Sequence, residues 1–481
     1  MYKRFTQNMY ARKKYFVSIV ALLSLVGIFI FIQKNNKRKR YNVLVLSTCS
    51  LSTSRLSVYN SAFHSTPNVD KLAEESYVFN NAITDMSWSN VSGFLSRIPS
   101  SNLVKNGYHA IGLPWSKEEI AWQQINGKNI PEYYMNIPNN SIIFNNMPRN
   151  YLDGLQFLKK KLQDKKNWPF LIEVHNKIIH LPYAKQLGPG NHILKLISPK
   201  SQSYIEEYIE NFDKYPERVP FSLYVMERKK TLTEAVIKTL KLDNQIAKSL
   251  KEKKYSPTFI GILNNRSILA KWKSSSFFET DLNVIKETYD KMLEIYDSSI
   301  EELLKLYNDK ELAENTVLIF TGDHGEAFFQ HEYMAHGETV FDEMIKFPLF
   351  IKFPGQHERK IINAQFYQQG IANIVNKIIE GKINEENFEE YIQKENNHPL
   401  IYSRNCANDI KSIRYKNKWK FVWNLKNEKK FLYDLINDPD ELRDVYDKNP
   451  EITSFLEENV DEIAMIQIKN KMVYPCREET E

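Results

Sequence analysis

Three short apolar runs in this sequence end at, or pass directly into, polar residues that include cysteine or histidine. The runs are YNVLVLST at 41–48, WPFLIEVH at 168–175 and NTVLIFTGDHGE at 315–326. Such runs, rich in Val, Ile, Leu and Phe, predict strands that are buried in a parallel sheet. Residues 289–312, before the third run, have apolar side chains at helical spacing and predict a long amphipathic helix. This alternation of helix and strand predicts an α/β fold with a mostly parallel central sheet flanked by helices.

The chain divides into three parts around these runs. Residues 1–40 form a tail and a membrane anchor, 41–400 form the α/β domain, and 401–481 form a C-terminal sheet subdomain and tail. A Lys- and Tyr-rich stretch at about 186–279 reads as an insertion in the α/β domain.

Local sequence patterns predict further helices and strands in the α/β domain and in the C-terminal part. TPNVDKLAEESYVFNNA, at 66–82, has a proline near a helix start and predicts a helix after the first strand. Aromatic and β-branched runs at 412–425 and 429–435 predict antiparallel strands, and the DPDE turn at 438–441 predicts that a helix follows.

The N-terminal part contains eighteen consecutive residues without a charge, at 15–32, which is just long enough to cross a bilayer core. The run ends in bulky residues and then basic ones, which favours an uncleaved transmembrane anchor over a cleaved signal peptide. Basic residues lie on both sides, so charge alone leaves the orientation open. We expect a single-pass membrane protein with a cytoplasmic tail.

The charge balance and the number of cysteines exclude some classes of protein. The 65 Lys and Arg nearly balance 59 Asp and Glu, and the net charge of +6 argues against a nucleic-acid-binding protein. The three cysteines, Cys49, Cys406 and Cys476, exclude a disulfide scaffold and a zinc ribbon. A single Cys406 to Cys476 bridge stays open, with free thiols as the alternative.

Candidate chemistry gathers at two of the predicted strand ends. Asp323 and His324 follow the third strand between two glycines, whose conformational freedom allows adjacent O and N ligands to face one cation. Further histidines lie in the same loop or end the second strand: His175, His180, His331 and His336. Each alone is more simply a surface or core histidine. Together, at the edge of an α/β sheet where sites form, they predict a pocket for an anionic ester and a cation.

The chain resembles the sulfatase family of the alkaline phosphatase superfamily over nearly everything after the anchor. The resemblance is carried, in order, by NVLVLST and STSRLSVY, TPNVDKLAEESYVFNNA, WPFLIEVHNKIIHLPY, NTVLIFTGDHGEAFFQHEYMAHGETVFDEMIKFPLFIKFPG, and KWKFVWNL with KFLYDLINDPDEL. It implies an alkaline-phosphatase-like α/β domain with a small C-terminal antiparallel sheet subdomain. The family's usual activity is hydrolysis of sulfate esters, and relatives cleave or transfer phosphate and phosphonate groups.

The resemblance implies roles for particular residues. Asp323 and His324 match metal ligands, while His180 and His336 match imidazoles that contact the substrate or protonate its leaving group. His175 and His331 are further candidates for substrate contact, with packing as the alternative for both. Lys420 matches only the strand pattern of the C-terminal subdomain, and no role is assigned to it.

The first half of the site departs from the family pattern. Cys49 and Ser50 stand where relatives carry acidic metal ligands. A Cys49 thiolate would favour zinc over calcium or magnesium, and the alternative is that this corner of the metal site has been lost. Both interpretations stay open.

The nucleophile also departs from the pattern. The stretch DMSWSNVSGFLSRIPS, at 85–100, lacks the C/S-x-P-x-R motif, so we expect no formylglycine. An unmodified serine is the candidate, with Ser89 preferred because relatives often carry a Trp directly before the hydroxyl residue, and with Ser87 as the alternative. A plain helix start is the competing interpretation of this stretch.

These observations predict a membrane-anchored hydrolase that acts on sulfate or phosphate esters through a metal-activated serine. One divalent ion is expected, with zinc, calcium, magnesium and manganese all open. The catalytic domain is expected outside the cytoplasm, and the ester could be carried by a glycan or a lipid. Two alternatives remain: an inactive sulfatase-like binding protein, and a transferase that moves a phospho-group to a surface glycan or lipid.

Overall fold

The computed structural model describes residues 40–88, 98–113, 162–176, 178–180, 183, 196–211, 214–218, 220–221, 266–307, 309–395 and 399–469. The predicted membrane span at 15–32 and the preferred serine, Ser89, both lie outside these residues. Among the helices that are described, none combines the length and the apolar character needed to cross a membrane. The anchor therefore stays a prediction.

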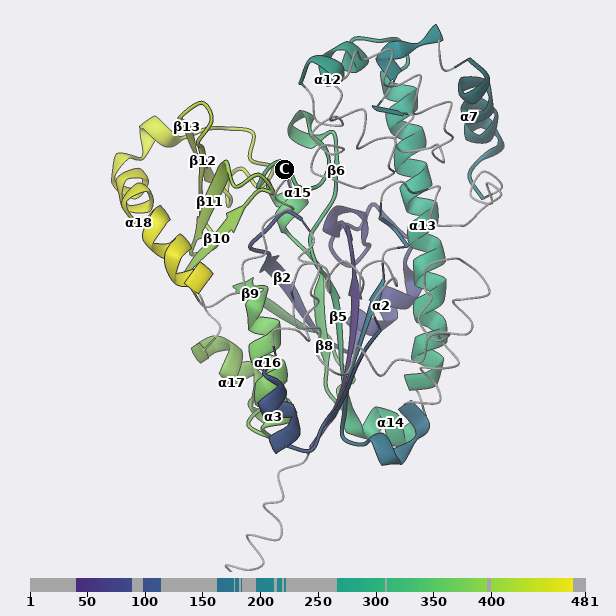
Figure 1. The fold of residues 1–481 in the computed structure, drawn as a ribbon, viewed down its shortest axis with the longest axis vertical. Helices are drawn as coiled ribbons and strands as arrows, with labels where there is room; N and C mark the ends of the chain where they lie inside the picture. The colour runs from purple at the N-terminus through teal and green to yellow at the C-terminus, as the bar shows by residue number, and fades with distance from the viewer. Residues whose placement is uncertain are drawn as a thin grey trace, which may run out of the picture.

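A seven-stranded sheet forms the centre of the larger part of the molecule (Figure 1). Its strands, in spatial order, are β3 (His109–Leu113), β4 (Phe170–Asn176), β1 (Asn42–Thr48), β5 (Thr316–Gly322), β8 (Leu349–Lys352), β2 (Tyr77–Ile83) and β9 (Lys360–Tyr367). Neighbouring strands are parallel except where β8 pairs antiparallel with β5 and β2. All residues of β1 and β5 are buried, as their unbroken apolar character predicts.

Helices cover both faces of this sheet (Figure 1). On one face lie α2 (Pro67–Glu74) and the long α13 (Phe278–Tyr307), and on the other lie α3 (Ser100–Lys105), α16 (Gln369–Ile379) and α17 (Glu385–Glu395). The two faces bury separate apolar cores, one packed around α13 and one around α16. The predicted α/β architecture with a mostly parallel sheet is confirmed.

A separate antiparallel sheet follows at the C-terminal end. It contains β10 (Leu400–Arg404), β11 (Ile410–Tyr415), β12 (Trp419–Asn424) and β13 (Lys429–Asp434), in that order, with α18 (Pro450–Lys469) packed against it. The predicted small sheet subdomain is therefore present. Figure 1 shows it beside the larger domain, next to the end of the sheet where α15 (Asp342–Ile345) lies.

Shorter elements complete the described chain. They are β6 (Ala327–Phe328), β7 (Met334–Ala335), α7 (Pro199–Asn211), α12 (Arg266–Lys273), α14 (Lys310–Asn315), and the 3-10 helices η1 (Thr53–Arg55), η3 (Lys165–Asn167), η7 (Pro216–Arg218), η8 (Gln330–Glu332) and η9 (Tyr446–Lys448).

Three details differ from the sequence-based expectations. The single helix expected over 289–312 is two helices, because the Asp309 side chain accepts hydrogen bonds from the backbone of Glu311 and Leu312 and starts α14. The first of the two, α13, begins at Phe278, inside the proposed insertion. The DPDE turn leads into irregular chain and η9, and the final helix starts only at Pro450.

Candidate metal and ester site

The parallel strands bring the predicted site residues to one edge of the sheet. Strand β1 lies between β4 and β5, with Ser47 opposite His175 and Thr48 opposite Gly322. The carboxyl ends of the three strands therefore coincide, and Cys49 and Asp323 begin the loops there. This edge is where an open α/β sheet forms its sites.

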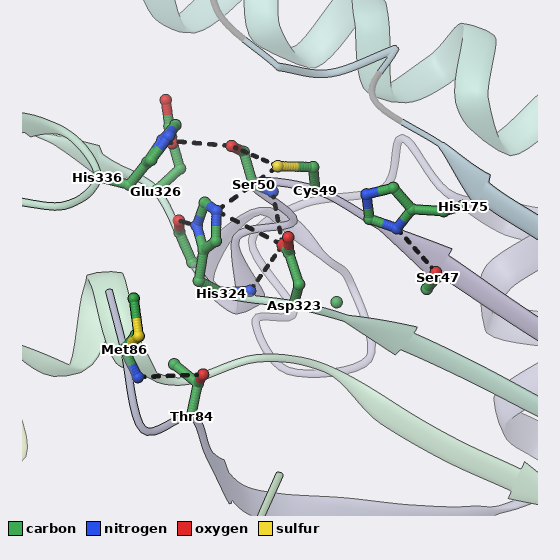
Figure 2. Close-up of polar contacts among 12 residues, drawn as sticks. Ser47, Cys49, Ser50, Thr84, Met86, His175, Asp323, His324, Glu326 and His336 are labelled. Carbon is green, nitrogen blue, oxygen red and sulfur yellow. Dashed lines mark hydrogen bonds and ion pairs between the residues drawn. The ribbon is translucent and has the colours of Figure 1, made fainter. Parts of the chain in front are cut away.

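Cys49, Asp323 and His324 come together at this edge (Figure 2). The Sγ atom of Cys49 lies 3.6 Å from Nε2 of His324, and the same nitrogen lies 3.6 Å from Oδ1 of Asp323. The ligand atoms of Cys49, His175 and Asp323 lie within 4.8 Å of one another, and those of His324, Glu326 and His336 form a second such group. Cys49 and His324 are fully buried, and 13% of the Asp323 side chain is exposed. This donor set fits a divalent ion.

Backbone contacts hold the Asp323 and His324 pair in place. Oδ1 of Asp323 accepts hydrogen bonds from the backbone nitrogens of Ser50, at 3.2 Å, and His324, at 2.8 Å. Nδ1 of His324 lies 2.8 Å from the carbonyl oxygen of Gly325. A carbonyl only accepts, so Nδ1 carries the proton and Nε2 presents its lone pair to the cluster. Burial lowers the pKa of His324, which keeps the ring neutral as a metal ligand must be.

The glycine after the pair is required by packing. A Cβ atom at Gly325 would lie 2.1 Å from the carbonyl oxygen of Glu343, a distance that no side chain can tolerate. The loop can therefore lie against α15 only with glycine at this position.

A second buried group lies beside the first and involves residues that sequence analysis did not assign. Oε2 of Glu326 lies 2.5 Å from Nδ1 of His336, and Oε1 of Glu326 accepts a hydrogen bond of 2.8 Å from the hydroxyl of Tyr183. Ser50 Oγ lies 3.3 Å from the same nitrogen of His336. Glu326 is part of the DHGE run and Tyr183 of the HLPY run, so both were visible in the sequence. Nothing in their spacing indicated that they would meet.

His336 is the point where the predicted imidazoles meet. Its ring centroid lies 4.3 Å from that of His324 and 5.1 Å from that of His180. The ring of Trp88 lies 5.0 Å away on another side. Nε2 of His336 is fully buried and has no hydrogen-bond partner among the described residues. The structure thus brings His180 and His336 to the candidate metal ligands.

Ser89 and Ser87 are the two candidate nucleophiles. Ser89 is outside the described residues. Ser87 is fully buried, its backbone nitrogen donates to the carbonyl oxygen of Arg404, and its hydroxyl has no hydrogen-bond partner in the described part of the chain.

His331 makes its polar contacts with Glu343 and Glu441, and not with the candidate metal ligands. Nδ1 contacts Glu343 at 2.8 Å, Nε2 donates to the carbonyl oxygen of Glu441 at 3.2 Å, and the ring stacks on Phe341 with centroids 3.7 Å apart. Burial alone would lower the pKa of His331, but Glu343 raises it above its usual value. Its role in substrate contact remains a prediction.

Lys420, to which no role was assigned, joins the two parts of the molecule. Its Nζ lies 2.8 Å from Asp342 on α15 and 2.7 Å from Glu441, and it is fully buried. Arg414 of β11 contacts the other oxygen of Asp342 at 2.5 Å. These ion pairs anchor the C-terminal subdomain to the loop that follows the site.

The three cysteines differ in their bonding state or in whether the structure describes them. Cys49 is a buried thiol that forms no disulfide, and Cys406 is disulfide-bonded. Cys476 lies outside the described residues.

The structure is that of an α/β protein with candidate metal ligands and clustered imidazoles at the carboxyl edge of its sheet. The sequence model of the family described as Sulfatase matches residues 125–379, more than half of the chain. The chain therefore belongs to the sulfatase family, as its motifs predicted. Members of this family typically bind a divalent metal ion, which agrees with the candidate ligands described above.

Solved structures share the fold at low sequence identity. A 2-O GAG sulfatase is 14% identical with a TM-score of 0.56, and the alignment covers 90% of this chain and 93% of that one. A protein solved with its substrate D-glucosamine-2-N,6-O-disulfate is 15% identical with a TM-score of 0.56, at 92% and 100% coverage. The phosphonate monoester hydrolase of Agrobacterium radiobacter is 14% identical with a TM-score of 0.54, at 90% and 96% coverage. No curated protein matches the chain in sequence.

Proposed function

We propose that this protein hydrolyses sulfate or phosphate esters through a serine nucleophile at a metal centre held by Asp323, His324 and Cys49. One observation carries the proposal: Nε2 of His336 is buried, has no hydrogen-bond partner among the described residues, and belongs to a ring 4.3 Å from that of His324. A metal ion and an imidazole that can carry a proton are the two groups that ester hydrolysis needs at one place.

The bound ion would supply positive charge to the ester oxygens and favour ionisation of the serine hydroxyl. Ser89 is the proposed nucleophile: its hydroxyl oxygen would bond to the sulfur or phosphorus atom as the bond to the leaving-group oxygen breaks, and water would then release sulfate or phosphate and restore the serine. It directly follows Trp88, whose ring packs near His336, so the chain reaches the imidazole cluster just before Ser89. Ser87 is the alternative.

His336 is set up to give or take a proton at one defined atom. Its Nδ1 faces the Glu326 carboxylate, which can only accept, so Nδ1 carries a proton and Nε2 is the nitrogen available to the leaving group. His180, whose ring lies beside that of His336, is the second imidazole proposed for the leaving group. We expect one of the two to protonate the departing oxygen.

The substrate proposed is an anionic ester on a glycan, with a lipid-borne ester as the alternative. The similar structures include a 2-O GAG sulfatase and a protein bound to a disulfated glucosamine, which supports the glycan. A phosphonate monoester hydrolase among them keeps phospho-ester chemistry open. The absence of a formylglycine motif makes phosphate a close competitor of sulfate.

The catalytic domain is proposed to lie outside the cytoplasm, tethered by the uncharged segment at 15–32. The disulfide at Cys406 supports this placement, because disulfides persist in oxidising compartments.

The test is hydrolysis of a panel of aryl sulfates, aryl phosphates and sulfated glycosaminoglycan fragments by the full-length chain in mild detergent. We expect one ester class to be turned over, and Ser89→Ala to abolish turnover while Ser87→Ala retains it. Loss in Ser87→Ala instead would move the nucleophile to the alternative residue. No turnover of any ester by the metal-loaded protein would overturn the proposal.

That last outcome would leave the inactive binding protein, which the loss of the first-strand acid at Cys49 favours. A transferase would be recognised by activity that appears only when a glycan or lipid acceptor is added.

A further inference from the structure

We propose that Arg404, the last residue of strand β10, binds an anionic group of the substrate. The group that it would take is an oxyanion: a sulfate, a phosphate or a carboxylate. The inference rests on the proposed function, because it adds a contact for the anionic substrate proposed there. It can nevertheless be tested by anion binding alone, without turnover of any ester.

Arg404 is a buried cation that lacks the kind of partner found at the other buried arginines. Four arginines of the described residues are buried, and Arg404 is 6% exposed. Each of the other three contacts a carboxylate: Arg55 contacts Asp290 at 3.0 Å, Arg218 contacts Asp281 at 2.6 Å, and Arg414 contacts Asp342 at 2.5 Å. Among the described residues, Arg404 forms no ion pair, and its guanidinium makes one hydrogen bond, to Sδ of Met86 at 3.4 Å.

This guanidinium is suited to an oxyanion. A buried charge without a counterion destabilises the folded state, and departures of this kind are expected at functional sites. A guanidinium stays charged in proteins and presents five N–H donors in a planar fork that matches carboxylate and phosphate oxygens. The thioether of Met86 is only a weak acceptor. An oxyanion would therefore supply both the missing counter-charge and better acceptors.

The backbone places Arg404 beside the candidate site. Its carbonyl oxygen accepts a hydrogen bond of 3.2 Å from the backbone nitrogen of Ser87, two residues before the proposed nucleophile. Two residues after Arg404, the backbone nitrogen of Cys406 donates to the carbonyl oxygen of Gly337 at 2.8 Å. Gly337 directly follows His336. Arg404 thus lies between the segment that leads to the nucleophile and the loop that carries the proposed catalytic imidazole.

The segment that leads to the nucleophile contacts the candidate site at two points. The Thr84 hydroxyl donates to Oε1 of Gln368 at 3.0 Å, and the amide of Gln368 donates to the carbonyl oxygen of Asp323 at 2.6 Å. Further along the segment, the ring of Trp88 lies 5.0 Å from that of His336. The segment therefore runs along the site from the candidate metal ligands to the imidazoles.

Met86 lies between these two contacts and shows where the charge of Arg404 is. Figure 2 shows the Met86 side chain extending from its backbone toward the side on which His324 and His336 lie. The sulfur of this side chain is the atom that contacts the guanidinium. The charged end of Arg404 therefore lies on the side of the segment that faces the site.

Two groups on a substrate have the chemistry that Arg404 would bind. One is the reacting ester group itself, and the other is a second acidic group on the same glycan, such as a carboxylate or another sulfate. In both cases Arg404 holds the substrate through charge-assisted hydrogen bonds and takes no part in proton transfer.

The first test is stabilisation of the full-length chain by anions in mild detergent. The Tm is measured in sodium sulfate and in sodium phosphate, against sodium chloride of equal ionic strength. We expect at least one of the two anions to raise the Tm of the wild type. Arg404→Met should weaken the apparent affinity for that anion roughly tenfold or more, because hydrogen bonds to a charged group are lost.

Matched variants separate specific binding from general effects. Sulfate and phosphate also stabilise proteins through their exclusion from the surface. Arg443→Met, at an exposed arginine, is therefore the control and should respond to the anions as the wild type does. Arg404→Lys keeps the charge but loses the planar fork, so it should bind the anion more weakly than the wild type.

Stability without added anion separates a binding role from a structural one. Arg404→Met removes a buried charge that has no carboxylate partner, so the free energy of unfolding in urea should stay unchanged or rise. A loss as large as that in Arg218→Met, which breaks a buried ion pair, would show that Arg404 has an internal partner. That result would overturn the inference.

Kinetics then identify which group Arg404 holds. If it is the reacting group, Arg404→Met lowers kcat/KM roughly tenfold or more even for an aryl ester with a single anionic group. If it is a second acidic group, the loss appears only with a glycan fragment that carries one. Unchanged kcat/KM with both kinds of substrate would contradict the assignment.

The inference fails if neither anion stabilises the wild type, or if Arg404→Met binds the anion as the wild type does. Its failure is separable from that of the proposed function. Anion binding that depends on Arg404, without turnover of any ester, would sink only the proposed function. Ester turnover with unchanged anion binding in Arg404→Met would sink only the role of Arg404.

Discussion

Glu326 and His336 form a fully buried carboxylate and imidazole pair, with Oε2 of Glu326 2.5 Å from Nδ1 of His336. The Tyr183 hydroxyl holds the other oxygen of Glu326 at 2.8 Å. The pair fixes which nitrogen of His336 faces the candidate ester, because only Nε2 is left without a partner among the described residues. Glu326 is thus a positioning residue for a proposed catalytic imidazole.

Removal of this carboxylate should slow the chemical step more than it weakens substrate binding. We expect Glu326→Ala to lower kcat by roughly 100-fold, the lower range for one proton-transfer group, with a much smaller change in KM. Glu326→Gln keeps a hydrogen-bond acceptor for Nδ1 and should retain more activity than Glu326→Ala. Steady-state kinetics of the two variants make the comparison, and equal losses in both would argue against the positioning role.

Gly325→Ala should destabilise the folded chain strongly. The added Cβ would lie 2.1 Å from the carbonyl oxygen of Glu343, which is backbone and cannot move aside freely. We expect a loss of about 3 kcal/mol or more in the free energy of unfolding, measured by urea denaturation. The control is Gly107→Ala, where φ is +69° but the nearest atom is 3.8 Å away, and where about 1 kcal/mol is expected from the backbone alone. Similar losses in both variants would refute the packing argument.

Arg218→Met should also be costly, because it leaves a buried carboxylate without its only oppositely charged partner among the described residues. Arg218 contacts both oxygens of Asp281, at 2.6 and 3.1 Å, and Asp281 is fully buried. Burial raises the pKa of Asp281 even with Arg218 opposing it.

We expect Arg218→Met to lower the free energy of unfolding by about 3–5 kcal/mol. The exposed pair of Lys165 and Glu311, at 2.6 Å, supplies the control, since Lys165→Met should cost less than about 1 kcal/mol. A small loss in Arg218→Met would show that the buried pair contributes little.

Glu338 should make stability depend on pH. Burial, together with repulsion from Asp409, raises the pKa of Glu338 to about 7 in the folded chain, from an ordinary value of 4.5. Between these values the unfolded chain loses the proton while the folded chain keeps it, so stability falls as pH rises from about 4.5 to about 7 and then levels off.

Glu338→Gln removes this contribution. Urea denaturation at pH 5 and pH 8 should show a drop in the wild type that is smaller in the variant by on the order of 1 kcal/mol. An identical pH dependence in both proteins would contradict the assigned shift.

The sequence allowed much of the fold to be predicted because its strongest signals are local. Strands β1, β4 and β5 are short and mainly apolar, and the spacing from Met292 to Leu303 identifies the helix that covers them. The strand order is not local. That β8 runs antiparallel between β5 and β2 depends on contacts between segments far apart in the chain, and the four-residue run LFIK carries no sign of its direction.

The candidate site likewise contains residues that local sequence signals predict and residues that only distant contacts bring together. The proximity of Asp323 and His324 to His175 could be predicted because these residues lie at the ends of strands in one parallel sheet, whereas Cys49 was a candidate only through the family resemblance. Glu326 could not be predicted, because its contact with His336 is made by the short hairpin of β6 and β7, and two-residue strands leave no periodic pattern. The contact of His175 with Ser47 depends on the register of β1 and β4, which places these two residues opposite each other.

The measurement that tests the central claim most directly is ester hydrolysis by the full-length chain before chelation, after removal of bound metal, and after zinc, calcium, magnesium or manganese is added back. The account predicts turnover of a sulfate or phosphate ester that is lost on chelation, restored by at least one of these ions, and absent in Asp323→Ala under all conditions. Turnover that survives complete metal removal, or no turnover of any ester with any of the four ions, would contradict it.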